Sequence, residues 1–455
     1  MKFTAWTLLT DVGLLGGLLL VGMLVRAKLG VAQRLLLPAS VVGGALGLVL
    51  GPNVLRVLPF SDQLAVYPSV LIVVVFAALP LQSSVRASGG FGRAVGRFLG
   101  YSVASYTLQF GLGLLFALLV LGQFWDLPAG FGVMLAAGWA GGFGTAAAMG
   151  TTFAGQGWAE ATSLGFTSAT VGTLVGTVGG IALSYWGAST GRISGLPRFA
   201  DLPASMRTGL IDAEEEREPI GQATVSSSSV ESLMVQLGIV AAVSAAGYGV
   251  TKLVALAWPS LSVPVFAVAF LISALVRAVL GRTACWRYVC TRSMRSVSGT
   301  ATDVLVVTGI ASIVPAYLRG YVAPLAVLMA FGLVFCLVMF RVVGPWALGQ
   351  GWVERALFTW GWATAALFAS MALLRMIDPK LRGGTVEEYG AGYVLWAPVE
   401  IASVTFVPLL IGVGLTWVVV GGWTAIGLAG LALVAVLART RARTPSARET
   451  AREAS

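Results

Sequence analysis

Long apolar runs separated by short polar segments dominate the hydrophobic pattern of the chain. A helix that crosses a bilayer needs about 20 consecutive apolar residues, and eleven runs have roughly that length. They are residues 5–26, 35–51, 65–82, 96–123, 158–186, 232–257, 261–280, 299–317, 320–343, 389–419 and 422–438. The pattern therefore predicts an all-α membrane protein with about 11 transmembrane helices.

Two further apolar stretches, about 128–154 and 346–376, are interrupted by glycine and tryptophan. The first contains the run Gly-Trp-Ala-Gly-Gly-Phe-Gly-Thr-Ala-Ala-Ala-Met-Gly at 138–150. Because each glycine costs a helix about 1 kcal/mol relative to alanine, we expect this run to be non-helical. Such backbone survives at membrane depth only inside protein or beside a watery cavity. We therefore predict two re-entrant hairpins, each entering and leaving on one side of the membrane.

The two halves of the chain share motifs in the same order. Gly-Phe-Gly-Thr-Ala-Ala at 142–147 returns as Gly-Trp-Ala-Thr-Ala-Ala at 361–366, and Leu-Pro at 37–38 corresponds to Val-Pro at 263–264. This order predicts two inverted five-helix repeats, each with a re-entrant hairpin, plus one C-terminal helix. Chance similarity between Ala/Val/Leu-rich spans is the alternative. The predicted parts are a first repeat at 1–186, a polar linker at 187–231, a second repeat at 232–419, and an extra helix with a basic tail at 420–455.

Charge gives the orientation. Only 11% of the residues are charged and 57% are hydrophobic, whereas soluble domains carry roughly 25% charged residues. The net charge of +10 resides in short loops and not on one basic surface, which argues against nucleic-acid binding. With the N-terminus outside, only Lys2, Arg56, Lys252 and Arg319 lie outside, and the other 25 of the 29 Lys and Arg residues face the cytoplasm. The positive-inside rule thus favours a multi-pass inner (plasma) membrane protein with a cytoplasmic C-terminus.

The cytoplasmic segments have simpler expected roles. The linker at 187–231 mixes charges with a run of serines, so we expect a disordered tether. The last helix ends in the basic run Arg-Thr-Arg-Ala-Arg at 439–443, which suits an anchor to anionic lipid.

Broken helices turn free N–H groups and a partial positive charge toward their tips, which favours a carboxylate. We therefore expect a small carboxylate solute, with Thr145 and Thr364 as side-chain donors and glycines that allow close approach. The predicted substrate-binding residues are Gly141, Gly142, Phe143, Gly144, Thr145, Gly361, Trp362 and Thr364. Helix packing by small residues is the alternative role of the glycines. Trp139 and Trp360 at the tips favour a cavity lining over interfacial anchoring.

Carboxylates within spans are functional candidates because burying a charge in a membrane is expensive. Glu400, in the tenth span, is the first candidate for a cation or proton site, and Asp303, which opens the eighth span, is the second. Asp11 and Glu160 lie nearer the outer ends of their spans, where we expect solvated carboxylates. The chain contains no histidine, so any proton coupling would use carboxylates.

The sequence carries no P-loop, no HExxH and no hydrolase or kinase signature. It predicts no catalytic residue and no enzyme. The three cysteines lack histidine partners for a zinc site of the usual kind, so we expect free thiols and no metal site.

The motifs resemble those of the sodium/glutamate symporter (ESS) family. The family's first re-entrant loop carries a Gly-Gly-His-Gly-Thr-Gly-Ala-Ala-like run, where this chain has Gly-Gly-Phe-Gly-Thr-Ala-Ala at 141–147, and its second helix is similar to Leu-Pro-Ala-Ser-Val-Val-Gly-Gly at 37–44. The family's histidine is Phe143 here, its second motif reads Phe-Thr-Trp-Gly-Trp-Ala at 358–363, and an acidic residue of its tenth helix aligns near Phe406. These departures leave another substrate, another coupling ion or lost activity open.

The resemblance implies sodium-driven uptake of glutamate, with Na⁺ as the coupling ion. It also implies a homodimer in which a scaffold part joins the two copies while a transport part, including both hairpins, moves across the bilayer. The leading hypothesis is thus a cation-coupled symporter of a small carboxylate that uses elevator-type alternating access. The alternative is a transport-dead sensor or membrane assembly subunit. A passive channel fits less well, because inverted hairpins suit two occluded states.

Overall fold

The computed structural model describes residues 3–82, 92–193, 203–214, 217–257, 263–378 and 383–439. These residues form helices and connecting loops, and no strand occurs among them. Each of the eleven predicted spans contains a helix. Among the described residues, seven helical segments are long and apolar enough to cross a membrane by length and composition: Ala5–Lys28, Arg93–Gln123, Ala161–Ser189, Ser232–Ala257, Val322–Leu348, Thr385–Gly412 and Thr416–Arg439.

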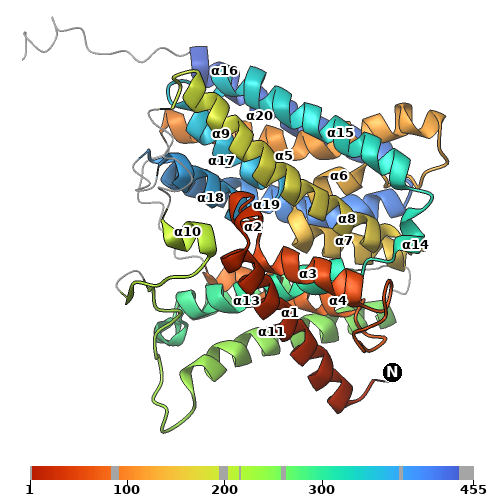
Figure 1. Cartoon of the computed structure of the whole chain (residues 1–455), viewed down its shortest axis with the longest axis vertical. Coiled ribbons are helices and arrows are strands. Elements are labelled where there is room, and N and C mark those ends of the chain that lie inside the picture. The colour runs from red at the N-terminus through yellow and green to blue at the C-terminus, as the bar shows by residue number, and fades with distance from the viewer. Residues whose placement is uncertain are drawn as a thin grey trace, which may run out of the picture.

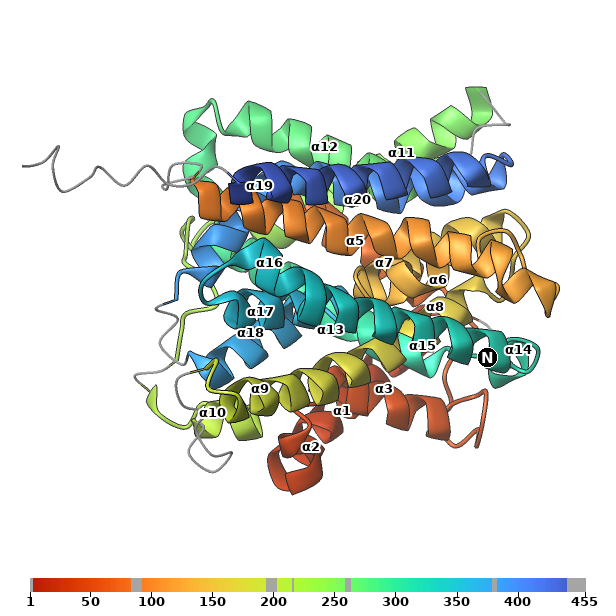
Figure 2. The same cartoon turned by 90° about the horizontal axis from the view of Figure 1, so that it is seen from above.

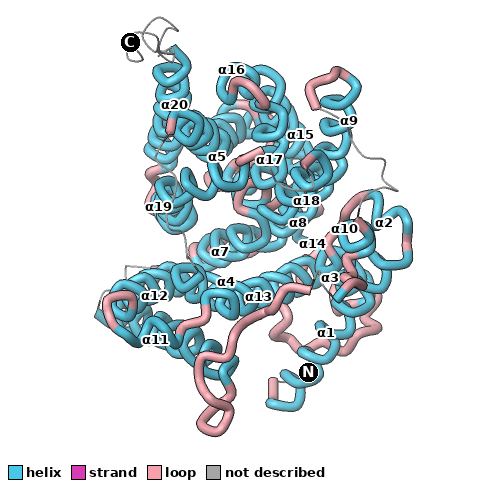
Figure 3. The backbone as a smooth tube through the Cα atoms, turned by 90° about the vertical axis from the view of Figure 1, so that its left-hand side faces the viewer, coloured by secondary structure: helices cyan, strands magenta, loops and turns pink. Residues whose placement is uncertain are grey.

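The helices form two layers (Figures 1 and 3). The first layer consists of α1 (Ala5–Lys28), α3 (Ala39–Leu50), α4 (Tyr67–Ala78), α11 (Ser232–Ala257), α12 (Val265–Leu280) and α13 (Thr291–Ala311). In this layer α1 packs on α3 and α11 packs on α12, while α13 packs on both α3 and α4. The first layer thus combines the first three long helices of each half of the sequence.

The second layer contains the later helices of each half of the sequence (Figure 3). Its first-half members are α5 (Arg93–Leu119), α6 (Val133–Gly138), α7 (Gly142–Gly155), α8 (Ala161–Leu174) and α9 (Gly180–Ser189). Its second-half members are α15 (Val322–Val338), α16 (Gly344–Leu348), α17 (Trp352–Thr364), α18 (Leu367–Ile377), α19 (Thr385–Gly412) and α20 (Thr416–Arg439). The two layers meet where α7 packs on α4 and α13, and where α8 packs on α13.

Short π-helical segments join two pairs of helices in the second layer. The segment η3 (Val175–Gly179) continues α8 into α9, and η7 (Met339–Val343) continues α15 into α16. A π-helical turn displaces the regular backbone hydrogen bonds and often marks a functional position. In both segments a side chain from another helix donates to a backbone carbonyl: Tyr101 Oη to Met339, and Trp360 Nε1 to Gly176.

Several predicted boundaries were wrong for local reasons. The helices α3 and α12 begin directly after Pro38 and Pro264 and not at residues 35 and 261, because the residue before a proline disfavours helical backbone. The helix α13 begins at Thr291 and not at 299. Hydropathy marks only its apolar part, whereas the backbone hydrogen bonds continue through the polar turns before it.

The final helix, α20, packs against other helices of the second layer. It lies along α5, and the two backbones approach closely at a pair of glycines. A Cβ atom on Gly100 would lie 2.6 Å from the carbonyl oxygen of Gly430, and a Cβ on Gly430 would lie 2.6 Å from that of Gly100. Small residues permit such close helix contacts in membranes. The predicted basic anchor beyond Arg439 lies outside the described residues.

The described parts of the linker are fastened to the helices, contrary to the expectation of a disordered tether. They include the short helix α10 (Ala204–Thr208), where Arg26 Nη2 donates to the carbonyl of Met206. Ser296 Oγ on α13 donates to the carbonyl of Ile220. The amino-acid composition of the linker suggested disorder, because composition gives no information about individual hydrogen bonds between the linker and the helices.

Candidate functional site

Two interrupted helix pairs meet inside the second layer. In the first helix pair, α6 and α7 are separated at 139–141, and in the second helix pair, α17 and α18 are separated at 365–366. Gly142, the first residue of α7, has φ +63°, and a Cβ atom there would lie 2.8 Å from the carbonyl oxygen of Ala365. Both a left-handed backbone and a close approach therefore require glycine at this position. The two breaks are in contact.

The breaks expose helix N-termini at their meeting point. The helix α7 follows Gly141, and α18 follows Ala366, whose backbone is extended with φ −177° and ψ 172°. Neither N-terminus has a side-chain cap. The first N–H groups of a helix have no partner within the helix, and they carry partial positive charge. Two such ends in one region favour an anionic group.

Most of the glycine-rich run is helical, so the expectation of irregular backbone over 138–150 was wrong. The non-helical part is confined to 139–141 and α7 continues to Gly155. Glycine here serves tight packing: a Cβ on Gly150 would lie 2.7 Å from Thr162 Cα on α8. Tertiary packing of this kind outweighs the weak intrinsic propensity of glycine.

The two threonines predicted as donors differ. Thr145 is 4% exposed, and its hydroxyl makes no hydrogen bond with a described residue. Further along α7, Thr151 and Thr152 each donate to a backbone carbonyl one turn earlier. Thr364 Oγ1 is likewise engaged, donating to the carbonyl of Trp360. Only Thr145 of the predicted pair keeps its hydroxyl free for a ligand.

The two tip tryptophans, both expected to line a cavity, differ: Trp139 lies in the packed core, whereas Trp360 borders a small cavity between α5, η7 and α17. Trp139 is fully buried, and a Cβ on Gly172 of α8 would lie 2.8 Å from its Cδ1. Trp360 Nε1 donates to the carbonyl of Gly176 at 3.2 Å. Glycines on α8 and η3 leave room for these rings, which the apolar pattern does not reveal. Phe143 stacks on Phe166, with ring centroids 6.3 Å apart.

Two predicted glycines also have packing roles. A Cβ on Gly361 would lie 2.4 Å from the backbone nitrogen of Ser370, so this glycine closes the two arms of the second helix pair on each other. A Cβ on Gly144 would lie 3.2 Å from Ile72 of α4, which places Gly144 at the boundary between the two layers. The glycines therefore combine close packing with the unusual backbone of Gly142.

Glu400 lies in an aromatic cluster that reaches the second helix pair. Tyr393 Oη donates to its carboxylate at 3.0 Å. Trp396 packs on Tyr393 with centroids 5.5 Å apart and on the predicted site residue Trp362 at 5.6 Å. The rings of this cluster come from α5, α17 and α19: Phe98, Tyr106, Phe358, Trp362, Tyr389, Tyr393 and Trp396. Glu400 is thus joined to α17 through aromatic contacts and not directly to the meeting point of the breaks.

Asp303 occupies a different place from the one predicted. It lies well inside α13 and does not open that helix, because α13 begins twelve residues earlier, at Thr291. It is exposed and interacts with the hydroxyl of Ser40 on α3. Asp303 therefore belongs to the first layer, whereas both helix breaks belong to the second.

Asp11 was predicted to be a solvated carboxylate, and this was wrong. It is 1% exposed and accepts hydrogen bonds from the Ser61 backbone N–H, at 2.9 Å, and from the hydroxyls of Ser61 and Tyr67. Three donors compensate the burial of the charge. They come from the loop between α3 and α4 and from the start of α4, so no local pattern around Asp11 could indicate them. Glu160 is half-buried at the start of α8.

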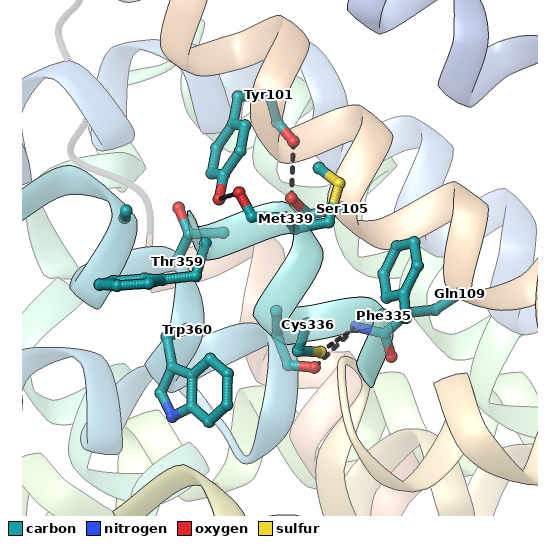
Figure 4. A pocket seen from close by; sticks show the side chains of 11 residues that line it. Tyr101, Ser105, Gln109, Phe335, Cys336, Met339, Thr359 and Trp360 are labelled. Carbon is teal, nitrogen blue, oxygen red and sulfur yellow. Dashed lines mark hydrogen bonds between the residues drawn. The ribbon is translucent and has the colours of Figure 1, made fainter. Parts of the chain in front are cut away.

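A small cavity between α5, η7 and α17, lined by both apolar and polar side chains, was not predicted (Figure 4). Its volume of about 10 Å³ corresponds to about one water molecule. Gln109 lines it and donates through Nε2 to the carbonyl of Ala363 at 2.8 Å, while its Oε1 is buried without a partner among the described residues. The π-helical turn that places Met339 opposite Tyr101 has no known sequence signature. The hydropathy pattern therefore predicts only a continuous apolar helix in this region.

The described residues contain no group of three or more potential metal ligands. Cys285, Cys290 and Cys336 are free thiols. The site is therefore built from backbone groups, one free hydroxyl and a peripheral carboxylate.

Comparison with protein families decides what class of protein this architecture serves. A family model described as "Sodium/glutamate symporter" matches residues 7–367. The chain belongs to the sodium/glutamate symporter family. It is accordingly a multi-pass membrane transporter of a small solute and not an enzyme. No curated protein and no solved structure matches this symporter-family chain significantly.

The extent of the match bears on the candidate residues. It ends at Leu367, the first residue of α18, so it covers both helix breaks and Thr145. The remainder of α18, α19 with Glu400, and α20 lie beyond it. The meeting point of the two breaks is thus within the part of this symporter-family chain that carries the family's sequence pattern.

Proposed function

We propose that this protein is a cation-coupled symporter of glutamate or a related small carboxylate, and that it binds the solute where its two helix breaks meet. The observation that carries the proposal is the contact between Gly142 and Ala365, which brings the uncapped N-termini of α7 and α18 together. The free hydroxyl of Thr145, one turn into α7, supplies a polar side chain beside them. Neither helix start needs a basic residue to attract a carboxylate.

The proposal includes two re-entrant hairpins in an inverted repeat. Broken helices in corresponding halves of a transporter form its midplane site. The packing of the first layer supports the repeat, because α1 packs on α3 as α11 packs on α12, and because α3 packs on α13 as α12 packs on α4. Charge placement supports eleven crossings, with the N-terminus outside and the C-terminus in the cytoplasm.

Movement of one layer past the other would supply alternating access. In this elevator-type mechanism, the first layer is the scaffold and joins two copies in a homodimer, while the second layer carries the site across the bilayer. Both helix breaks belong to the second layer, and the layers meet chiefly through α7 and α8. A unit that holds the complete site can move without taking the site apart.

The coupling ion is proposed to be sodium, from membership in the family, or a proton carried by a carboxylate. Glu400 suits the second role, because it is half-buried, is held by Tyr393 and contacts α17 through the aromatic cluster. Asp303 is the less favoured candidate, since it lies in the other layer.

The second candidate function is that of a transport-dead sensor or assembly subunit. Phe143 stands where the family has a histidine, and the buried rings of Trp139 and Trp360 fill the space around the breaks. A site filled in this way could bind a ligand without transporting it.

The deciding experiment is uptake of labelled glutamate, aspartate and short dicarboxylates into sealed proteoliposomes, with a sodium gradient, a proton gradient or neither. Thr145→Val should lower uptake roughly tenfold, since a hydrogen bond to a charged group contributes about 1.5–3 kcal/mol. Thr152→Val is the matched control on the same helix, because its hydroxyl bonds only to Ala148. Ligand-induced thermal stabilisation without any gradient-driven flux would favour the sensor and reject the symporter.

A further inference from the structure

A groove runs between α9 and α15 on the surface of the second layer. Its volume is about 550 Å³, and its walls are apolar side chains of α9 and α15, among them Leu183, Val334 and Val338. Val334 is 59% exposed and Val338 is 45% exposed. In a membrane transporter, an open apolar groove of this kind faces lipid.

Two arginines lie over the ring of Trp186, which borders the groove. The Cζ atoms of Arg341 and Arg192 lie 3.8 and 4.8 Å from the centroid of the Trp186 ring. Arg341 and Trp186 both line the groove. Arg192 also lies 5.7 Å from the centroid of Trp352. The indole faces attract the guanidinium groups through the ring quadrupole, which holds two positive charges at one indole ring.

These two charges are not neutralised by the part of the chain that the structure describes. The ion pairs found there join Arg217 to Glu214 and Arg355 to Glu388. The guanidinium groups of Arg192 and Arg341 make neither an ion pair nor a hydrogen bond with a described residue, and both side chains are exposed. Two like charges held at one indole ring, with no acidic partner among the described residues, attract an anion.

Arg192 lies just after the end of α9, and Arg341 lies in η7, just before α16. The end of α9, the helix α16 that follows η7, and the C-terminal end of α20 lie at the same end of the molecule (Figures 1 and 2). The positive-inside rule assigns this end to the cytoplasmic leaflet, which carries the anionic lipids. An apolar groove with two arginines toward its cytoplasmic end complements both the acyl chains and the charged headgroup of a phospholipid.

We propose that the α9–α15 groove binds one anionic glycerophospholipid. One acyl chain would lie along Leu183, Val334 and Val338, and the phosphate would accept hydrogen bonds from Arg192 and Arg341. One arginine side chain can donate two parallel N–H hydrogen bonds to a phosphate. The lipid would thereby bridge α9 of the first half and α15 of the second, on the outer surface of the second layer.

Titration of the purified full chain in detergent with phosphatidylglycerol tests the proposal, with thermal unfolding and native mass spectrometry as readouts. Arg192→Gln/Arg341→Gln should raise the half-saturating lipid concentration roughly 25-fold, because each basic residue near anionic lipid contributes about a factor of five. The matched control, Arg282→Gln/Arg287→Gln, removes two exposed arginines elsewhere and should leave that concentration unchanged. Val338→Trp, which fills the groove and keeps both charges, should weaken binding similarly.

Four results would contradict the proposal. An equal loss in the control pair would show attraction to general surface charge, and normal binding by Val338→Trp would show that the groove is not occupied. Equal stabilisation by phosphatidylcholine or by inorganic phosphate would show that no anionic lipid is selected. If the double glutamine variant does not fold, Arg192→Lys/Arg341→Lys keeps the charge but loses the planar donor geometry, and it should bind at intermediate strength. Wild-type binding by that lysine pair would count against paired guanidinium recognition.

Discussion

Replacement of Gly142 by alanine tests the contact between the two breaks most directly. The native φ of +63° would place an alanine in the left-handed region, and its Cβ would lie 2.8 Å from the carbonyl oxygen of Ala365. The backbone conformation costs about 1–2 kcal/mol for a residue with a Cβ. The close contact adds about 1–3 kcal/mol, as overpacking usually does. Because the contacting atom belongs to the backbone of the other break, the two breaks must move apart.

The assay combines thermal unfolding of the purified protein at one scan rate with gradient-driven uptake in proteoliposomes. We expect Gly142→Ala to lower the unfolding midpoint by several degrees and to reduce uptake by at least about tenfold, which corresponds to about 1.4 kcal/mol. Gly142→Asn separates the two causes, since asparagine tolerates the left-handed conformation but has the same Cβ. It should retain the contact penalty and lose most of the conformational one.

The matched control is Gly155→Ala at the other end of α7. A Cβ there meets nothing within 4 Å, so we expect wild-type uptake and unchanged or slightly higher stability. If Gly142→Ala unfolds and transports like the wild type while Gly155→Ala behaves the same way, the two breaks do not meet as described and the proposed site loses its foundation.

Three further outcomes are expected. Glu400→Gln keeps the shape of the side chain but removes the charge beside Tyr393. It should abolish the dependence of uptake on the coupling cation, while solute binding measured by calorimetry persists. Unchanged cation dependence would exclude Glu400 from coupling. Asp11→Asn should lower the free energy of unfolding by about 1–3 kcal/mol, because its amide nitrogen cannot accept hydrogen bonds from the buried donors of Ser61 and Tyr67. The exposed control Asp126→Asn should leave the free energy of unfolding unchanged. Equal stability of the two variants would refute the buried hydrogen-bond network. The half-buried ion pair of Arg355 and Glu388 has nitrogen–oxygen distances of 2.6 and 2.7 Å. Arg355→Ala should therefore lower the unfolding midpoint, and the charge swap Arg355→Glu/Glu388→Arg should recover part of the lost stability. If the charge swap is no more stable than Arg355→Ala, the loss is due to packing and not to the ion pair.

The apolar helices and the two interruptions could be predicted from residue order. Long apolar runs impose helices in a membrane, because backbone groups that lipid cannot satisfy must bond within the segment. Glycine and tryptophan near 142–147 and 361–366 marked both breaks, and the shared motifs identified the family. These are local properties of the chain, which neighbouring residues carry regardless of what packs against them.

The details of the site depended on partners distant in sequence. The contact that excludes a Cβ atom at Gly142 is made by Ala365, more than 200 residues away in the sequence. The burial of Asp11 likewise depends on hydrogen bonds from Ser61 and Tyr67. The same holds for the tryptophans at the tips, whose position is set by small residues on α8 and η3. Hydropathy and helix propensity sum over neighbouring residues, whereas burial, hydrogen bonding and steric contact arise between helices. Tertiary packing alone therefore decided which of the predicted residues are free to bind a solute and which hold the two helix pairs together.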